Sequence, residues 1–165
     1  MSSREILPHD RVNRPLSDDP AFFYPKEFYV LDNFSSFQVE FDGQLWPTSE
    51  HAYQAAQFKE CAPDVFLQIL EARSAHDAQK IAFKNRSRRN SEWESLKVEK
   101  MKEILICKVE QHPYVHKKLL ESGTREIIED SWRDAEWGWG ENKDGENKLG
   151  KIWMEIREEF RAKAK

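Results

Sequence analysis

The segment Trp46-Pro47-Thr48-Ser49-Glu50-His51 brings a carboxylate, an imidazole and a large aromatic ring together at the expected start of a helix. A carboxylate in a first helical turn lies at the positive end of the helix dipole, which favours its ionised form. An ionised glutamate could act as a base toward water or stabilise an oxocarbenium ion developing on a sugar. Glu50 is therefore a catalytic candidate. The alternative is that it is simply a favourable first-turn residue.

Residues 134–150 form a second segment of this kind, with Asp134, Trp137, Gly138 and Asn147 among further glycines and tryptophans. Glycine lets a ligand approach the backbone closely, and an indole face stacks on a flat ring. We therefore expect a ligand-binding loop, in which Asp134 is a second catalytic carboxylate. A purely structural loop is the alternative.

Two lysines of the most strongly predicted helix, Lys97 and Lys108, fall in the sector bounded by Trp93, Met101 and Ile104. Lysine is almost never fully buried unless it is paired. A desolvated lysine loses its charge readily, and neutral lysine attacks aldehydes to give Schiff bases. Lys97 is accordingly a third catalytic candidate. The alternative is that the stems run along the apolar stripe while the ammonium groups reach solvent.

Residues 84–90 concentrate positive charge in a chain whose net charge is −4. Arginine forks match phosphate oxygens, so Lys84 and Arg86 are predicted phosphate contacts, with a solvated loop as the alternative. Because the chain as a whole is acidic, any contact with nucleic acid must come from such a local patch.

Other polar residues have narrower readings. Glu50, Gln54 and Gln57 recur at helical spacing and predict a partly buried polar wall, or else a solvated face. His112 and His116 have metal-chelating spacing, but the proline between them and the lack of a nearby third ligand argue against a metal site. No metal and no cofactor are expected.

The composition, 39% hydrophobic and 34% charged over 165 residues, fits one soluble domain at 21–165. No apolar run approaches the roughly 20 residues of a membrane helix. Residues 1–20 lack a secretory signal and are expected to be flexible or laid on the surface. Cys61 and Cys107 match no zinc or disulfide pattern. These features predict a cytoplasmic protein, or a nuclear one in a eukaryote, without a membrane partner; they carry no signal for an oligomeric state.

Periodicity predicts the elements that position these residues. Alternation over 37–41, an Asp42-Gly43 turn and a return strand at 45–46 predict a hairpin, and 27–32 reads as another strand. The predicted helices cover 49–59, 63–73, 75–83, 93–110, 114–121, 124–130 and 150–162, with loops at 84–91 and 131–149. The predicted fold is α+β and mainly α, a single compact domain of about six to eight helices with a small antiparallel β element.

Together these residues resemble the NADAR, or YbiA-like, family of N-glycosidases over about residues 22–160. The two blocks at 46–51 and 134–150 are jointly specific, whereas either alone is only suggestive. The matching elements are Asn33-Phe34, Asp42-Gly43, Trp46-Pro47-Thr48-Ser49-Glu50-His51, Gln54, Phe58, Trp93-Glu94-Ser95-Leu96-Lys97, Met101, Lys108, Asp134, Trp137-Gly138, Gly145, Asn147, Leu149-Gly150, Met154 and Arg157.

The resemblance implies hydrolysis of an N-glycosidic bond between a ribose and an amine. It suggests two substrates: ADP-ribose attached to guanine in DNA or RNA, or the phosphoribosylamino-pyrimidine of riboflavin synthesis. Gln57 stands where the family commonly has lysine, and Ala82-Phe83 where it commonly has Gly-Arg. The expected substrate-binding residues are Asn33, Phe34, Trp46, His51, Gln54, Lys84, Arg86, Trp93, Lys108, Trp137, Gly138 and Asn147.

Two other classes of protein remain open. A non-catalytic module that binds ADP-ribose or a nucleotide would use the aromatic and basic loops without needing Glu50. An interaction protein would use exposed tryptophans as hot spots and would lack a small-ligand pocket.

Overall fold

The structure is a computed structural model that describes residues 20–23 and 28–164. The chain divides into two compact units. The central unit is Asn33–Lys117, and the terminal unit combines the described residues up to Asp32 with those from Lys118 onward. The expected flexible segment, residues 1–20, lies outside the described part of the chain except for Pro20.

The central unit contains the predicted hairpin, in which β2 (Val39–Phe41) pairs antiparallel with β3 (Gln44–Trp46). Asp42 and Gly43 both have positive φ, at 54° and 75°. Positive φ at both central residues matches the twist of a tight two-residue hairpin, which is why an Asp-Gly pair predicts one. The predicted hairpin is confirmed.

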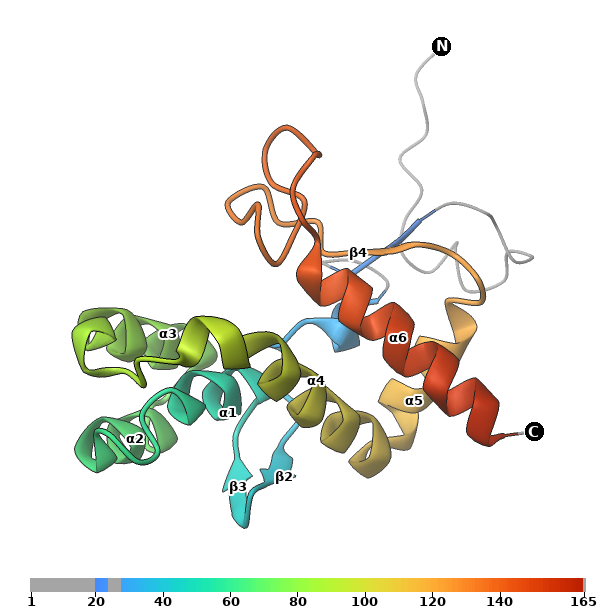
Figure 1. Ribbon diagram of the computed structural model, residues 1–165. Helices are drawn as coiled ribbons and strands as arrows, with labels where there is room; N and C mark the ends of the chain where they lie inside the picture. The colour runs from blue at the N-terminus through green and yellow to red at the C-terminus, as the bar shows by residue number, and fades with distance from the viewer. Residues whose placement is uncertain (1–19, 24–27, 165) are drawn as a thin grey trace. The chain divides into compact units, whose positions relative to one another are not determined.

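Four helices lie wholly in the central unit: α1 (Ser49–Ala56), α2 (Pro63–Leu70), α3 (Ala75–Lys84) and α4 (Trp93–Gln111). Helices α1, α2 and α3 pack against one another, and α1 also packs on α4 (Figure 1). The short 3-10 turn η3 (Arg86–Arg88) lies in the predicted basic loop. Helix α1 ends three residues before the predicted Lys59, and α4 follows its predicted bounds closely.

Helix α5 (Pro113–Glu121) contains the division between the units. In the terminal unit, β1 (Ala21–Phe22) pairs in parallel with β4 (Ile127–Ile128), and α6 (Lys148–Lys163) packs on β4. The indole of Trp153 on α6 is buried and donates to the carbonyl of Leu31. Burial of large apolar side chains on α6 therefore ties the two ends of this unit together.

Two predictions of secondary structure were wrong. The described part of 27–32 forms a 3-10 turn, η2 (Tyr29–Leu31), because Val30 and Leu31 are both buried and so do not alternate as in a half-buried strand. The expected helix at 124–130 contains β4, where two buried β-branched residues suit a strand. The mainly α fold with a small antiparallel sheet is confirmed, and the parallel pair adds to it.

Across the residues placed by the structure, no helix has the length and apolar character to span a membrane.

Candidate functional site

The start of α1 holds Glu50 in place through a set of short polar contacts. Thr48 is the N-cap, and its hydroxyl accepts a hydrogen bond from the backbone N–H of His51 at 3.1 Å. The Ser49 hydroxyl donates to Asn33 Oδ1 at 3.1 Å, and the Glu50 backbone N–H donates to the Asn33 carbonyl at 3.2 Å. Asn33, predicted to bind substrate, thus fixes the turn that carries Glu50.

The Glu50 side chain lies on the face of α1 that the sequence predicts to be a polar wall. Glu50 is only 5% exposed, and its Oε1 accepts from Gln54 Nε2 at 2.7 Å. Gln54 Oε1 in turn accepts from Gln57 Nε2 at 2.6 Å. The polar wall is confirmed as a chain of hydrogen bonds, with buried carboxylate at one end.

His51 has both ring nitrogens engaged. Nε2 lies 3.0 Å from the carbonyl of Ala72, which only accepts, and Nδ1 lies 2.8 Å from Thr48 Oγ1. The neutral ring satisfies both when Nε2 carries the proton and Nδ1 accepts from the threonine hydroxyl. Desolvation lowers the pKa of His51 below 6.5, which favours this neutral form. The ring therefore braces the N-terminus of α1; contact with substrate stays a prediction.

Helix α4 carries the two predicted buried lysines. Lys97 is 6% and Lys108 0% exposed, so their burial is confirmed. Lys108 Nζ donates to Ser35 Oγ at 2.9 Å and lies over the Phe37 ring. Lys97 Nζ donates to Glu94 Oε2 at 2.6 Å. The buried stem of Lys97 thus carries an ammonium group with a carboxylate one turn away.

Glu94 joins Lys97 to a second cation. Its Oε1 accepts from Arg89 at 3.0 Å while Oε2 accepts from Lys97. The Lys97 hydrogen bond, together with the charges of Lys97 and Arg89, holds the pKa of Glu94 below its usual value. Sequence reasoning missed this role of Glu94, although its spacing of three residues before Lys97 is a typical helical ion-pair signal.

Three aromatic candidates of the central unit differ in exposure. Trp46 is buried, donates through Nε1 to the Phe41 carbonyl and packs edge-on against Phe66. Trp93 is buried at the start of α4 beside the Tyr53 ring, at 5.3 Å between centroids. Phe34 is exposed. Of these three, Phe34 alone presents a ring to solvent, and contact between any of them and substrate stays a prediction.

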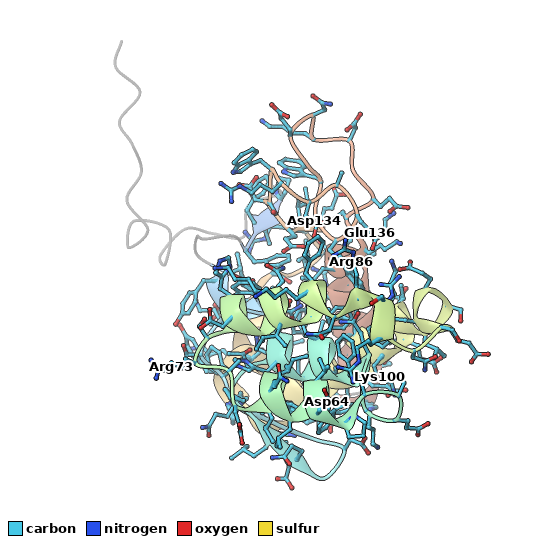
Figure 2. The ribbon with its side chains drawn as sticks, turned by 90° about the vertical axis from the view of Figure 1, so that its left-hand side faces the viewer. Asp64, Arg73, Arg86, Lys100, Asp134 and Glu136 are labelled. Carbon is cyan, nitrogen blue, oxygen red and sulfur yellow. The ribbon has the colours of Figure 1, made fainter. Side chains whose placement is uncertain are left out.

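The basic segment divides into paired and unpaired cations. Arg88 forms a two-pronged ion pair with Asp64 of α2, and Arg89 pairs with Glu94. Arg86 instead stacks 4.3 Å from the Phe83 ring centroid. Figure 2 shows Arg86 and Asp64 on the surface of the central unit. Within the described ranges, no ion pair involves Lys84 or Arg86, so both charges remain available to an anion.

A groove of about 950 Å³ lies between α2 and α3. Its wall includes Lys84 with Arg73, Lys80 and the exposed ring of Phe83, together with the carboxylates of Glu71 and Asp77. Cations beside an aromatic ring suit a phosphate-bearing ligand with a flat group. Glu50 is not among the groove's lining residues.

The loop at 131–147 in the terminal unit contains the other candidates. Asp134 Oδ1 accepts from the backbone N–H groups of Glu136 and Trp137, each at 2.9 Å. This carboxylate oxygen shapes the turn that presents Trp137, which is half-buried. A Cβ on Gly138 would lie 2.8 Å from the Glu129 carbonyl, so the loop packs too tightly there for any other residue.

Asn147 ends this loop in a left-handed conformation, with φ of 49°. Its Oδ1 accepts from the Glu129 N–H at 3.0 Å and its Nδ2 donates to the Ile127 carbonyl at 2.9 Å. The side-chain amide therefore acts as a strand partner for β4. The structure gives Asn147 a positioning role, and direct contact with substrate stays a prediction.

Each unit thus groups its own candidates. The central unit links Asn33, Gln54 and Glu50 directly and pairs Lys97 with Glu94; the terminal unit groups Asp134, Trp137, Gly138 and Asn147 in one loop. No cluster of metal-binding side chains occurs in residues 20–23 and 28–164. A fixed, buried carboxylate can act as an acid or base, or can stabilise a cation that develops on a polar bond.

A buried glutamate at a helix start, in a mainly helical α+β fold, suits an enzyme that uses a carboxylate as base or as a stabiliser of positive charge. The comparisons make this specific. Residues 21–161 match the NADAR domain model. The chain is 33% identical to the N-glycosidase YbiA of Escherichia coli K12, covering 91% of this chain and 94% of that protein. The solution structure of E. coli YbiA matches with a TM-score of 0.82 and 30% identity, over 93% and 92% of the two chains. The chain belongs to the NADAR family.

Two further relatives carry the names of an N-glycosidase and of a riboflavin biosynthesis protein. An N-glycosidase of Nostoc punctiforme is 29% identical over 85% of this chain and 92% of that protein. A riboflavin biosynthesis protein of Vibrio vulnificus is 35% identical over 93% of this chain but only 42% of that protein. The predicted family is confirmed, and so, at the level of the family, is the predicted class of enzyme, a hydrolase of N-glycosyl bonds.

Proposed function

We propose that this protein hydrolyses the N-glycosyl bond between a phosphorylated ribose and an amine of a heterocycle, and that its substrate is ADP-ribose attached to guanine in nucleic acid. The observation that carries the proposal is the buried Glu50 carboxylate, which is oriented by Gln54 in the first turn of α1. Family membership and the N-glycosidase relatives support the reaction class.

In the proposed reaction the bond from the anomeric carbon to nitrogen breaks, and its electron pair leaves with the base, whose nitrogen takes up a proton. Glu50 stabilises the positive charge on the sugar and accepts a proton from the water that adds to the anomeric carbon. For the terminal unit, the resemblance to the family predicts that Asp134 orients a ribose hydroxyl and that Trp137 stacks on a flat ring. The products are ADP-ribose and an intact guanine.

The phosphate groups require cations. Lys84 and Arg86 form no ion pair with a carboxylate in the described structure. The α2–α3 groove adds Arg73 and Lys80, which outnumber its carboxylates once Lys84 is counted, since among the described residues only Glu71 and Asp77 line it. These local charges support an anionic substrate although the net charge of the chain is −4. We assign the phosphates to this basic segment.

For Lys97 we propose electrostatic anchoring of the substrate. The Glu94 carboxylate at 2.6 Å favours the charged ammonium, which is not a nucleophile. The covalent alternative, a Schiff base with ring-opened ribose, predicts that borohydride traps an enzyme–sugar adduct. Wild-type protein without an adduct, and Lys97→Ala with reduced turnover, would support the anchor. An adduct lost in Lys97→Ala would support the Schiff base. Lys100→Ala is the matched control, since Lys100 pairs with Glu103 on the exposed side of the same helix.

A second candidate substrate is the phosphoribosylamino-pyrimidine of riboflavin synthesis, favoured by relatives in Vibrio vulnificus and maize that are named riboflavin biosynthesis proteins. The test is purified protein offered each substrate separately, with products identified by mass spectrometry and kcat/KM compared. We expect release of ADP-ribose from the modified oligonucleotide to be preferred. Preference for the pyrimidine would replace the proposed substrate, and binding without release of either would support a non-catalytic module.

A further inference from the structure

Gln57 lies at the far end of the hydrogen-bonded face of α1 from Glu50. It is 6% exposed, and its side-chain Nε2 donates both to Gln54 Oε1 at 2.6 Å and to the Gln54 carbonyl at 3.1 Å. Its own carbonyl accepts from the backbone N–H of Asn90 at 2.9 Å. Gln57 is therefore fixed at its backbone and at its side chain.

The Glu50 carboxylate decides which group donates in each hydrogen bond between Glu50, Gln54 and Gln57. An ionised carboxylate only accepts hydrogen bonds, so Gln54 must turn its NH2 group toward Glu50 Oε1. Gln54 Oε1 then faces Gln57, and Gln57 must donate to it. Both amides point their donors toward Glu50, so their dipoles are aligned with its negative charge.

We infer that Gln57 is a positioning residue that acts on Glu50 through Gln54, holding the carboxylate ionised and aimed. A donor on Gln54 Oε1 polarises that amide and strengthens its bond to Glu50, because hydrogen bonds in a chain reinforce one another. A stronger bond to the ionised form favours that form. The inference rests on the proposed function for its catalytic meaning, whereas the effect on Glu50 exists whatever the reaction.

Three substitutions of Gln57 should change the Gln57–Gln54–Glu50 row of hydrogen bonds in different ways. Leucine removes the donor and keeps the bulk. Glutamate places an acceptor and a negative charge against Gln54 Oε1. Lysine keeps a donor and adds a positive charge. If Gln57 served only to pack, the three variants would not shift the pKa of Glu50 in any set order. If Gln57 acts through its donor and its charge, the pKa of Glu50 should follow the donor and charge of each variant.

The experiment is a carbon-13 titration of the Glu50 carboxylate in ligand-free protein, with the signal assigned by its loss in Glu50→Gln. We expect the titration midpoint to fall in the order Gln57→Glu, Gln57→Leu, wild type, Gln57→Lys, from highest pH to lowest. For Gln57→Leu the upward shift should be roughly 0.1 to 0.6 pH units, since one cooperative neighbour strengthens a charged hydrogen bond by about 10–30%. The acid limb of the activity profile should move with it.

Two further variants separate this role from general disturbance. Gln68→Leu changes an exposed glutamine of α2 and should leave the Glu50 midpoint unchanged. In a Gln54→Leu background, Gln57→Leu should cause no further shift, because the intermediate of the chain is gone. An unchanged midpoint in Gln57→Leu, or the same shift with and without Gln54, would overturn the inference. Because the titration needs no substrate, failure of the proposed activity would be seen separately, as absence of turnover by wild-type protein.

Discussion

The start of α1 and the loop at 131–147 are both rich in polar contacts, but they are built differently. At α1, two side-chain pairs add to the contacts with the backbone: Ser49 donates to Asn33, and Gln54 donates to Glu50. In the loop, side chains and backbone hold backbone, as when Asp134 binds two N–H groups. The first arrangement sets the charge and direction of one carboxylate; the second sets a shape.

This difference predicts different responses to substitution. Near Glu50, changes that keep size but alter a donor or charge should affect chemistry more than stability. In the loop, the N–H of Gly145 donates to Trp139 and that of Leu149 to Trp137. Loss of a side chain that holds this backbone should lower stability first.

The sharpest challenge to this contrast is Asp134→Asn, which removes the charge but keeps Oδ1 as an acceptor for Glu136 and Trp137. If Asp134 also takes part in the reaction, turnover should fall by roughly 10² or more while the melting temperature changes little. Steady-state kinetics and thermal unfolding of the same preparation measure both. Full turnover in Asp134→Asn would show that the charge of Asp134 takes no part in the reaction, and that this residue only holds the backbone of the loop.

Asn147 tests the structural half of the comparison. Asn147→Gly keeps the left-handed backbone but removes both side-chain bonds, leaving the Ile127 carbonyl of β4 and the Glu129 N–H that follows the strand without that amide. We expect a loss of about 2 to 3 kcal/mol in the free energy of unfolding. Asn147→Ala should lose about 1 kcal/mol more, because a residue with Cβ is strained at this φ. Denaturant titration measures both. Equal stability of the two variants would show that φ carries no cost here.

Glu94→Gln sharpens the comparison at α4. The variant removes the carboxylate charge beside Lys97 and Arg89, and we expect about tenfold lower turnover, a smaller loss than in Lys97→Ala. Stability should change by less than about 1 kcal/mol, since the Glu94 side chain is 63% exposed. The pKa of Glu94 is lowered in the folded protein. The ion pair is therefore fully formed at any pH above the usual pKa of a glutamate, and it is lost only as the pH falls through the lowered pKa of Glu94. Turnover of Glu94→Gln as low as that of Lys97→Ala would contradict simple positioning.

The smallest effect concerns His51. Its folded-state pKa lies below 6.5, so the neutral ring contributes stability above that pH, and the contribution is lost as pH falls. Wild-type protein should therefore lose more stability between pH 7.5 and 5.5 than His51→Gln does. His76→Gln, at an exposed position, should retain the wild-type slope. If stability fell equally with pH in wild type and His51→Gln, protonation of the His51 ring would not be the cause of the loss.

Much of this molecule could be predicted from local pattern. The Asp-Gly turn and the long helix carrying Lys97 each have a signal within a few residues, and both appear in the structure. A hydroxyl cap is expected at Thr48 or Ser49, and the structure shows it at Thr48. The polar face of α1 follows from helical spacing alone. Burial of Lys108 could be predicted from a helical wheel because its neighbours on that face are apolar.

Other features depend on pairing between distant segments. Strand β4 exists because Ile127 meets Ala21, and two residues are too few to show a period. The side-chain amide of Asn147 donates to the Ile127 carbonyl of β4, as a neighbouring strand would, and only the fold reveals this role. Likewise, the second ring nitrogen of His51 is satisfied by the carbonyl of Ala72, which no spacing predicts.

The most direct test of the central claim measures binding and cleavage together on an oligonucleotide carrying ADP-ribosyl-guanine, with wild type, Glu50→Gln and the exposed control Glu60→Gln. Single-turnover cleavage is followed by mass spectrometry and binding by fluorescence anisotropy. We predict that all three bind with similar affinity, and that wild type and Glu60→Gln release ADP-ribose while Glu50→Gln is slower by roughly 10² to 10⁴. Release by Glu50→Gln at the wild-type rate, or binding by wild type without release, would contradict the account.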